Sequence, residues 1–129
     1  MEINPEKTPY VMLGGQDGVD ALAKAFYDRM ERDDDVTQVR SLHAEDLTEA
    51  REKFRKFLTG WLGGPQLYME AFGHPRLRMR HAPFSIGDDQ VTEWLTCMGR
   101  AMDDCTIEGP IRSFLDERFI HVANFLRNT

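Results

Sequence analysis

The sequence predicts an all-α protein, and two observations lead to this fold class. No segment alternates apolar and polar residues with the period of a half-buried strand, whereas several segments repeat apolar residues with the helical period. Glycine and proline clusters at 14–15, 63–65 and 109–110 separate these segments, and such clusters end one helix before the next begins. We therefore expect four long helices and several short ones in a single domain over residues 1–129.

The composition is that of a globular protein and limits its partners. The 129 residues are 41% hydrophobic and 29% charged, which suffices for a buried core. Lys and Arg number 16 against 22 Asp and Glu, and the net charge of −6 argues against nucleic acid and anionic membranes as partners. No apolar run could span a bilayer or form a signal peptide, so we expect a cytoplasmic protein. Residues 1–8 are expected to form a loose N-terminal tail.

The first half of the chain predicts two long helices and two short ones. Thr8 and Pro9 are typical of an N-cap and a first helical residue, and the short helix they begin should stop at Gly14. A long helix over 17–32 has its apolar face at Val19, Leu22, Phe26 and Met30, with Tyr27 on the edge. A short helix can occupy 36–43. A long helix over 46–62, capped by Asp46, carries an apolar stripe of Leu47, Ala50, Phe54, Phe57, Leu58 and Trp61.

The second half contains an irregular segment and two long helices. After a short helix over 66–72, Pro75 and Pro83 leave room for at most two helical turns between Gly73 and Gly87. Inside a compact helical domain, such a segment more often serves a site than merely connects. A helix over 88–105 should bury Val91, Trp94, Leu95, Met98, Ala101 and Met102. A last helix begins at Gly109-Pro110, with a stripe of Ile111, Phe114, Leu115, Phe119, Val122, Phe125 and Leu126.

The common sequence motifs of catalysis and metal binding are absent. We find no zinc-ligand spacing, P-loop, dinucleotide fingerprint or nucleophile elbow. Cys97 and Cys105 lie eight residues apart on one predicted helix, about 12 Å, which is too far for a disulfide. In the irregular segment, His81 is either a half-exposed histidine in a basic loop or a metal ligand on a short helix, because neutral imidazole is a common ligand of transition metals.

Three further features have two interpretations each. The arginines at 76, 78 and 80 suit either a solvated turn or a site for a small anion such as a carboxylate. Trp94 and Tyr27 lie on interior helix faces, and each carries one polar hydrogen that needs a partner when buried. They are either core residues or a polar spot in an otherwise apolar interior.

One string of residues is more specific than any spacing. The run 73–84 reads Gly-His-Pro-Arg-Leu-Arg-Met-Arg-His-Ala-Pro-Phe, and Trp94 follows its second histidine by thirteen residues. These residues resemble the group II truncated hemoglobins. The resemblance extends over about residues 9–128, through the segments 13–15, 26–27, 42–47 and 57–65.

The resemblance implies a fold, a cofactor and a set of ligand-binding residues. The fold is a shortened globin, a two-over-two helical sandwich around heme b. His81 is implied to be the proximal ligand of the heme iron. Tyr27 and Trp94 match distal residues that donate hydrogen bonds to the ligand, and His43 matches a distal position that relatives fill with tyrosine, phenylalanine or histidine.

The resemblance also assigns the walls of the heme pocket. Ala50 and Phe54 match positions of the distal helix that face the ligand, and neither side chain can donate a hydrogen bond. The distal wall is implied to consist of Phe26, Ala50, Phe54, Phe57 and Leu58. The residues implied to contact heme are Lys53, Tyr68 and Arg78, as partners of its propionates, together with Phe84 and Trp94.

Three functions are compatible with these residues. The first is a heme protein that reversibly binds dioxygen and other diatomic gases for storage, transport or sensing. The second is a heme enzyme that consumes peroxide or reactive nitrogen species such as nitric oxide, with an unidentified reductase as its partner. The third is a heme-free helical interaction module, against which the resemblance weighs. Slow ligand release with slow peroxide turnover would favour the first function over the second.

Overall fold

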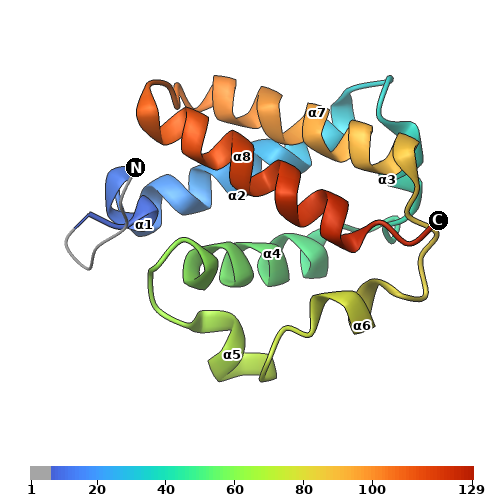
Figure 1. Cartoon of the computed structure of the whole chain (residues 1–129), viewed down its shortest axis with the longest axis horizontal. Helices are drawn as coiled ribbons and strands as arrows, with labels where there is room; N and C mark the ends of the chain where they lie inside the picture. Colours follow the sequence, from blue (N-terminus) through green and yellow to red (C-terminus); the bar gives the residue numbers. More distant parts are fainter. Residues whose placement is uncertain (1–6) are drawn as a thin grey trace.

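The computed structural model describes residues 7–129, and the described part of the chain is helical throughout (Figure 1). Its elements are α1 (Pro9–Met12), α2 (Gln16–Arg32), α3 (Thr37–Ser41), α4 (Thr48–Trp61), α5 (Leu67–Phe72), α6 (Leu77–His81), α7 (Asp88–Asp104) and α8 (Pro110–Leu126). Residues 1–6 of the predicted tail lie outside the described residues. Its last residue, Thr8, is buried, and its Oγ1 accepts a hydrogen bond from the Val11 N–H at 3.3 Å. Thr8 is therefore the N-cap of α1, not part of a loose tail.

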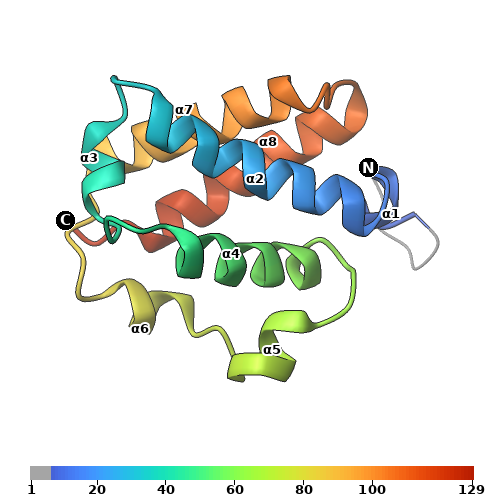
Figure 2. The same ribbon diagram turned by 180° about the vertical axis from the view of Figure 1, so that it is seen from behind.

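The four long helices form a two-over-two sandwich. Helix α2 packs against α4 and α7, and α7 packs against α8. The short helices α5 and α6 lie along the lower edge of the molecule in both views, below α4 (Figures 1 and 2). No helix within residues 7–129 is long and apolar enough to cross a membrane.

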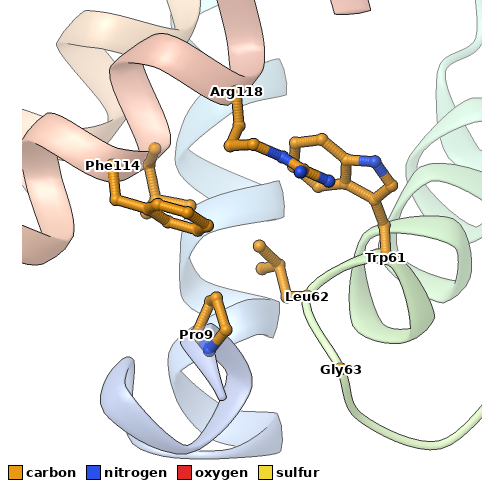
Figure 3. A pocket seen from close by; sticks show the side chains of 7 residues that line it. Pro9, Trp61, Leu62, Gly63, Phe114 and Arg118 are labelled. Carbon is orange, nitrogen blue, oxygen red and sulfur yellow. The ribbon is translucent and has the colours of Figure 1, made fainter. Parts of the chain in front are cut away.

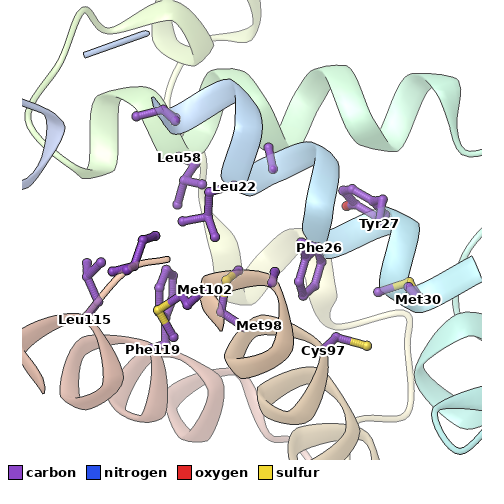
Figure 4. Packing of buried hydrophobic residues seen from close by; sticks show 14 of the residues in the cluster. Leu22, Phe26, Tyr27, Met30, Leu58, Cys97, Met98, Met102, Leu115 and Phe119 are labelled. Carbon is purple, nitrogen blue, oxygen red and sulfur yellow. The ribbon is translucent and has the colours of Figure 1, made fainter. Parts of the chain in front are cut away.

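The main core lies between α2, α7 and α8 (Figure 4). The four residues predicted for the inner face of α2 are all buried, with at most 1% of their surface exposed. Burying one large aliphatic or aromatic side chain stabilises the fold by about 1.5–3 kcal/mol. Across from α2, the core is closed by Met98, Met102, Leu115 and Phe119. Phe125, predicted for the buried stripe of α8, is instead 47% exposed, because it lies beyond this core beside Arg78.

The two cysteines are free thiols, as their spacing predicts. Cys97 is fully buried in the main core. Burial raises the pKa of its thiol to about 11, so the residue stays protonated at neutral pH. Cys105 is half-buried, and burial raises its pKa as well. Both side chains therefore serve as small apolar residues.

Helix α4 departs from its prediction in two ways. It begins at Thr48 instead of residue 46, although the Asp46 carboxylate still accepts a hydrogen bond from the Thr48 N–H at 2.9 Å. Much of its apolar stripe is only half-buried, including Ala50, Phe54 and Phe57. These side chains face a cavity instead of the packed core, which keeps part of their surface accessible.

Candidate functional site

A cavity of about 560 Å³ lies between α4, α6, α7 and α8. Its volume falls within the range of about 300–1,000 Å³ that is usual for sites of small organic molecules. The lining is mostly apolar, with a few polar groups. It comprises Tyr27, Val39, Leu42, His43, Ala50, Lys53, Phe54, Phe57, Leu58, Trp61, Tyr68, Pro75, Leu77, Arg80, His81, Phe84, Ile86, Gln90, Val91, Trp94, Phe119, Val122, Ala123 and Leu126.

His81 faces this cavity with one ring nitrogen already engaged. Its Nδ1 lies 2.7 Å from the Leu77 carbonyl oxygen. A carbonyl can only accept, so Nδ1 carries the hydrogen and Nε2 keeps its lone pair. Within residues 7–129, Nε2 has no hydrogen-bond partner, which leaves it free to coordinate a metal. His74 and His121 are exposed and do not line the cavity.

Trp94 and Tyr27 line the cavity from α7 and α2. Neither the Trp94 Nε1–H nor the Tyr27 hydroxyl has a hydrogen-bond partner in the described part of the chain, and neither atom is sealed from the cavity. Burial raises the pKa of the Tyr27 hydroxyl far above its ordinary value, although the Arg51 guanidinium beside its ring lowers it. Both residues are thus neutral donors available to a ligand.

Phe26 was expected in the wall of the cavity, and the structure corrects this position. The side chain is 1% exposed and does not line the cavity. Its ring lies behind the lining, with centroids 5.0 Å from Tyr27, 5.1 Å from Phe54 and 5.1 Å from Trp94. Phe26 therefore supports the rings that face the cavity and does not face it itself.

His43 reaches the cavity together with its neighbour Leu42. Its Nδ1 lies 2.9 Å from the Val39 carbonyl oxygen, so Nδ1 donates there and Nε2 is an acceptor in the neutral ring. The ring meets Tyr27 edge-on with centroids 5.8 Å apart. The pKa of His43 is lowered overall, because the effect of burial outweighs the hydrogen bond to Val39, which raises the pKa. At neutral pH, His43 therefore offers the cavity an acceptor, because its one donor hydrogen is used by the Val39 carbonyl.

The cationic side chains at the cavity differ from those expected. Lys53 and Tyr68 line it, as expected, and the Lys53 Nζ also lies 2.7 Å from Glu49. Arg78 does not line the cavity, because its guanidinium lies over the Phe125 ring at 5.0 Å. Arg80 lines it instead, with its guanidinium 5.7 Å from the centre of the Tyr68 ring. Arg80 is the site residue that the resemblance did not supply.

The helical period does not distinguish the two arginines. Leu77 and His81 lie four residues apart and share one face of α6, and Arg78 and Arg80 flank that face on opposite sides, because each lies three residues from one of the two. The sequence therefore carries no signal that selects Arg80, and only the structure places it at the cavity.

A second, smaller cavity of about 70 Å³ lies at the C-terminal end of α4 (Figure 3). It is lined by Pro9, Trp61, Leu62, Gly63, Phe114, Leu115 and Arg118. Trp61 lines both cavities, and the Arg118 guanidinium lies over its ring at 5.3 Å. This cavity is too small for an organic cofactor, which leaves the large cavity as the candidate site.

The large cavity fits a planar, largely apolar metal cofactor with acidic side chains. Within residues 7–129, no group of three His, Cys, Asp or Glu side chains is placed to hold a metal ion. His81, with its free Nε2, therefore suits a metal whose other ligands come from an organic ring. Apolar walls suit the faces of such a ring, and Arg80, Lys53 and Tyr68 suit carboxylates at its edge.

The two-over-two helical fold, with the α6 histidine His81 facing a large apolar cavity, defines a globin. Residues 8–128 match the family described as bacterial-like globin. The chain is 40% identical over 120 residues to the group 2 truncated hemoglobin YjbI of Bacillus subtilis, covering 93% of this chain and 88% of that protein. The chain therefore belongs to the group II truncated hemoglobins, a family whose cofactor is heme.

Solved structures agree with this assignment. The truncated hemoglobin of the Antarctic bacterium Pseudoalteromonas haloplanktis TAC125 superposes with a TM-score of 0.92 at 39% identity, over 95% of this chain and 99% of that one. The truncated oxygen-avid haemoglobin of Bacillus subtilis superposes with a TM-score of 0.86 at 39% identity, over 95% of this chain and all of that one. The shortened globin fold expected from the sequence is thus confirmed.

Proposed function

We propose that this protein binds dioxygen and other diatomic gases reversibly at heme b, with His81 as the protein ligand of the iron. The observation that carries the proposal is the set of unengaged groups at one apolar cavity. These are the Nε2 lone pair of His81 and the two donors of Trp94 and Tyr27. The similarity to a haemoglobin described as oxygen-avid supports the choice of dioxygen.

Heme iron, when bound, supplies the coordination position for the gas and gives electron density to dioxygen. The protein's part is to orient one imidazole and two donors. The Leu77 carbonyl fixes the tautomer of His81 and makes its Nε2 more basic. The Trp94 and Tyr27 donors face a largely apolar space, where a hydrogen bond to partial negative charge is stronger than in bulk water.

The mouth of the cavity supplies the remaining contacts. Arg80, Lys53 and the Tyr68 hydroxyl are the partners we assign to the two propionates, because carboxylates prefer cationic and hydroxyl donors. Ala50 and Phe54 offer no hydrogen bond to a ligand. Control of ligand release therefore falls on Trp94 and Tyr27.

Absorption spectroscopy and ligand kinetics test this function. The purified protein is reconstituted with heme, spectra are recorded in the ferric, ferrous and oxygenated forms, and dioxygen release is followed by stopped flow. We expect a stable oxygenated form that releases dioxygen slowly and turns over peroxide slowly. Rapid peroxide turnover with a reductant would contradict a binding function and favour the heme enzyme, and failure to take up heme would contradict both.

A further inference from the structure

Helix α6, which carries His81, has little packing of its own, although Ile86 at the end of the segment 74–86 is buried against Val91 and Ala123. No residue of α6 is buried, and no side chain of residues 74–86 forms an ion pair in the described part of the chain. Helix α8 contacts α6, and the end of the chain after α8 approaches the connection that follows α6. Figures 1 and 2 both show this end beside the connection between α6 and α7.

Asn128 and Thr129 hold this segment by hydrogen bonds. The Ile86 N–H donates to Asn128 Oδ1 at 2.9 Å, and the Asn128 N–H donates to the Ile86 carbonyl at 2.9 Å. The side-chain amide of Asn128 donates to the Phe84 carbonyl at 2.8 Å and approaches the His81 carbonyl at 3.4 Å. Thr129 adds one bond from its N–H to the Ile86 carbonyl at 3.2 Å. Within residues 7–129, these are all the hydrogen bonds that join the segment 74–86 to a distant part of the chain.

We infer that Asn128 is a positioning residue for His81, acting through the backbone of residues 81–86. An asparagine suits this place because its side chain must accept from one N–H and donate to two carbonyls, and it carries both an acceptor and two donor hydrogens. The inference rests on the proposed function, because it concerns the orientation of the imidazole toward the iron. It adds a residue outside the cavity lining to those that control the proximal side.

The physical consequence concerns how narrowly the imidazole is oriented. His81 is the last residue of α6, and between it and the buried Ile86 the backbone is held to the rest of the chain by the bonds to Asn128. Each net hydrogen bond stabilises a folded segment only modestly, and the exposure of Asn128 weakens its contacts further. Loss of two or three such bonds should therefore loosen the segment by about 5- to 50-fold in its local opening equilibrium.

Two variants separate the contacts of Asn128, and a third is the control. Asn128→Ala removes the side-chain bonds to Ile86, Phe84 and His81. Asn128→Asp keeps the acceptor for the Ile86 N–H but replaces the donors with oxygens that face carbonyls. Asn124→Ala is the matched control, because Asn124 is an exposed asparagine that donates to Ile120 and accepts from Arg127 but makes no bond to residues 74–86.

Two readouts are taken for each variant. Hydrogen exchange of the Ile86 amide is measured in the heme-free protein. The iron–histidine stretching band and the rate of heme transfer to an excess of acceptor globin are measured in the ferrous and ferric heme-bound protein. For Asn128→Ala we expect Ile86 exchange 5- to 50-fold faster, a broadened or shifted band, and faster heme loss. For Asn128→Asp we expect a similar change in the band and in heme loss, with Ile86 exchange close to that of the wild type.

Other outcomes overturn the inference. Suppose that both Asn128 variants have the same iron–histidine band and the same rate of heme loss as Asn124→Ala. Asn128 then does not position His81, even if exchange of the Ile86 amide is faster. Unchanged Ile86 exchange in Asn128→Ala would show that the contacts themselves do not hold the segment. A wild-type protein that takes up no heme would instead overturn the proposed function. The exchange data from the heme-free protein would still report whether the Asn128 contacts hold the segment.

Discussion

Trp94 and Tyr27 offer two different kinds of donor to a ligand in the cavity. The indole N–H of Trp94 can only donate, and the ring is held among aromatic neighbours, with centroids 5.1 Å from Phe26 and 5.7 Å from Phe119. The Tyr27 hydroxyl can donate or accept, and it can rotate. A fixed donor stabilises developing negative charge better, because little reorganisation is needed.

We therefore expect Trp94→Phe to speed dioxygen release more than Tyr27→Phe. One hydrogen bond to a charged group contributes about 1.5–3 kcal/mol, which corresponds to about a ten- to hundredfold change in rate. Stopped-flow release measures this change. Carbon monoxide is the control ligand, because it carries less charge on its outer atom and its release should change less. Equal acceleration of both gases would mean that the variant only widened the cavity.

His43 makes the stability of the heme-free fold depend on pH. Burial lowers the pKa of His43 in the folded state, so the unfolded chain takes up its proton more readily. Stability from this residue is present above the unfolded pKa of about 6.5 and is lost as the pH falls below it. In urea titrations between pH 8 and pH 5, we expect His43→Phe to lose less stability on acidification than the wild type. Parallel curves for the two proteins would contradict this account.

The sequence pattern predicted the helices well, because the residues that begin and end a helix are recognisable in the local sequence. Thr8-Pro9, Gly73 and Gly109-Pro110 stand at ends that the structure confirms. The inner face of α2 was also predictable, because it packs against protein along its whole length. Periodicity could not show that the stripe of α4 faces a cavity, since it separates apolar from polar faces and does not identify what covers the apolar one.

The candidate site was predictable only in part, for related reasons. The segment around His81 resembles a known family closely enough to predict that His81, Tyr27 and Trp94 share one pocket. All three line the large cavity. The resemblance failed for Arg78, whose guanidinium lies over the Phe125 ring, whereas Arg80 lines the cavity. The contribution of Asn128 could not be seen from the sequence, because its contacts depend on where α8 ends relative to a loop more than 40 residues away.

The turn after α4 gives a direct test of local packing. Gly63 has φ +100°, and a Cβ at this residue would lie 2.8 Å from the Thr8 Cβ. Gly14 is its matched control, because it has the same φ and open space within 4 Å. A left-handed alanine costs about 1–2 kcal/mol, which both substitutions share. Urea unfolding should show that Gly63→Ala loses at least about 1 kcal/mol more than Gly14→Ala, from the clash. Equal losses would mean that α1 shifts without cost.

At the scale of the whole molecule, the packed core and the cavity have separate roles. The core between α2, α7 and α8 is closed by protein alone, whereas α4, α6, α7 and α8 surround a cavity with apolar walls that protein does not fill. A ligand that binds only the folded state stabilises it by mass action. The half-exposed stripe of α4 and the sparse packing of α6 are what a fold completed by a large cofactor would show.

The most direct test of the central claim is the absorption spectrum of His81→Gly reconstituted with heme, recorded with and without added imidazole. His121→Gly is the control, because His121 is exposed and outside the cavity. If His81 holds the iron, the variant should retain heme poorly or show an altered Soret band, and imidazole should restore the wild-type spectrum by entering the space that the side chain leaves. The control should match the wild type. A His81→Gly spectrum identical to that of the wild type without imidazole would contradict the assignment.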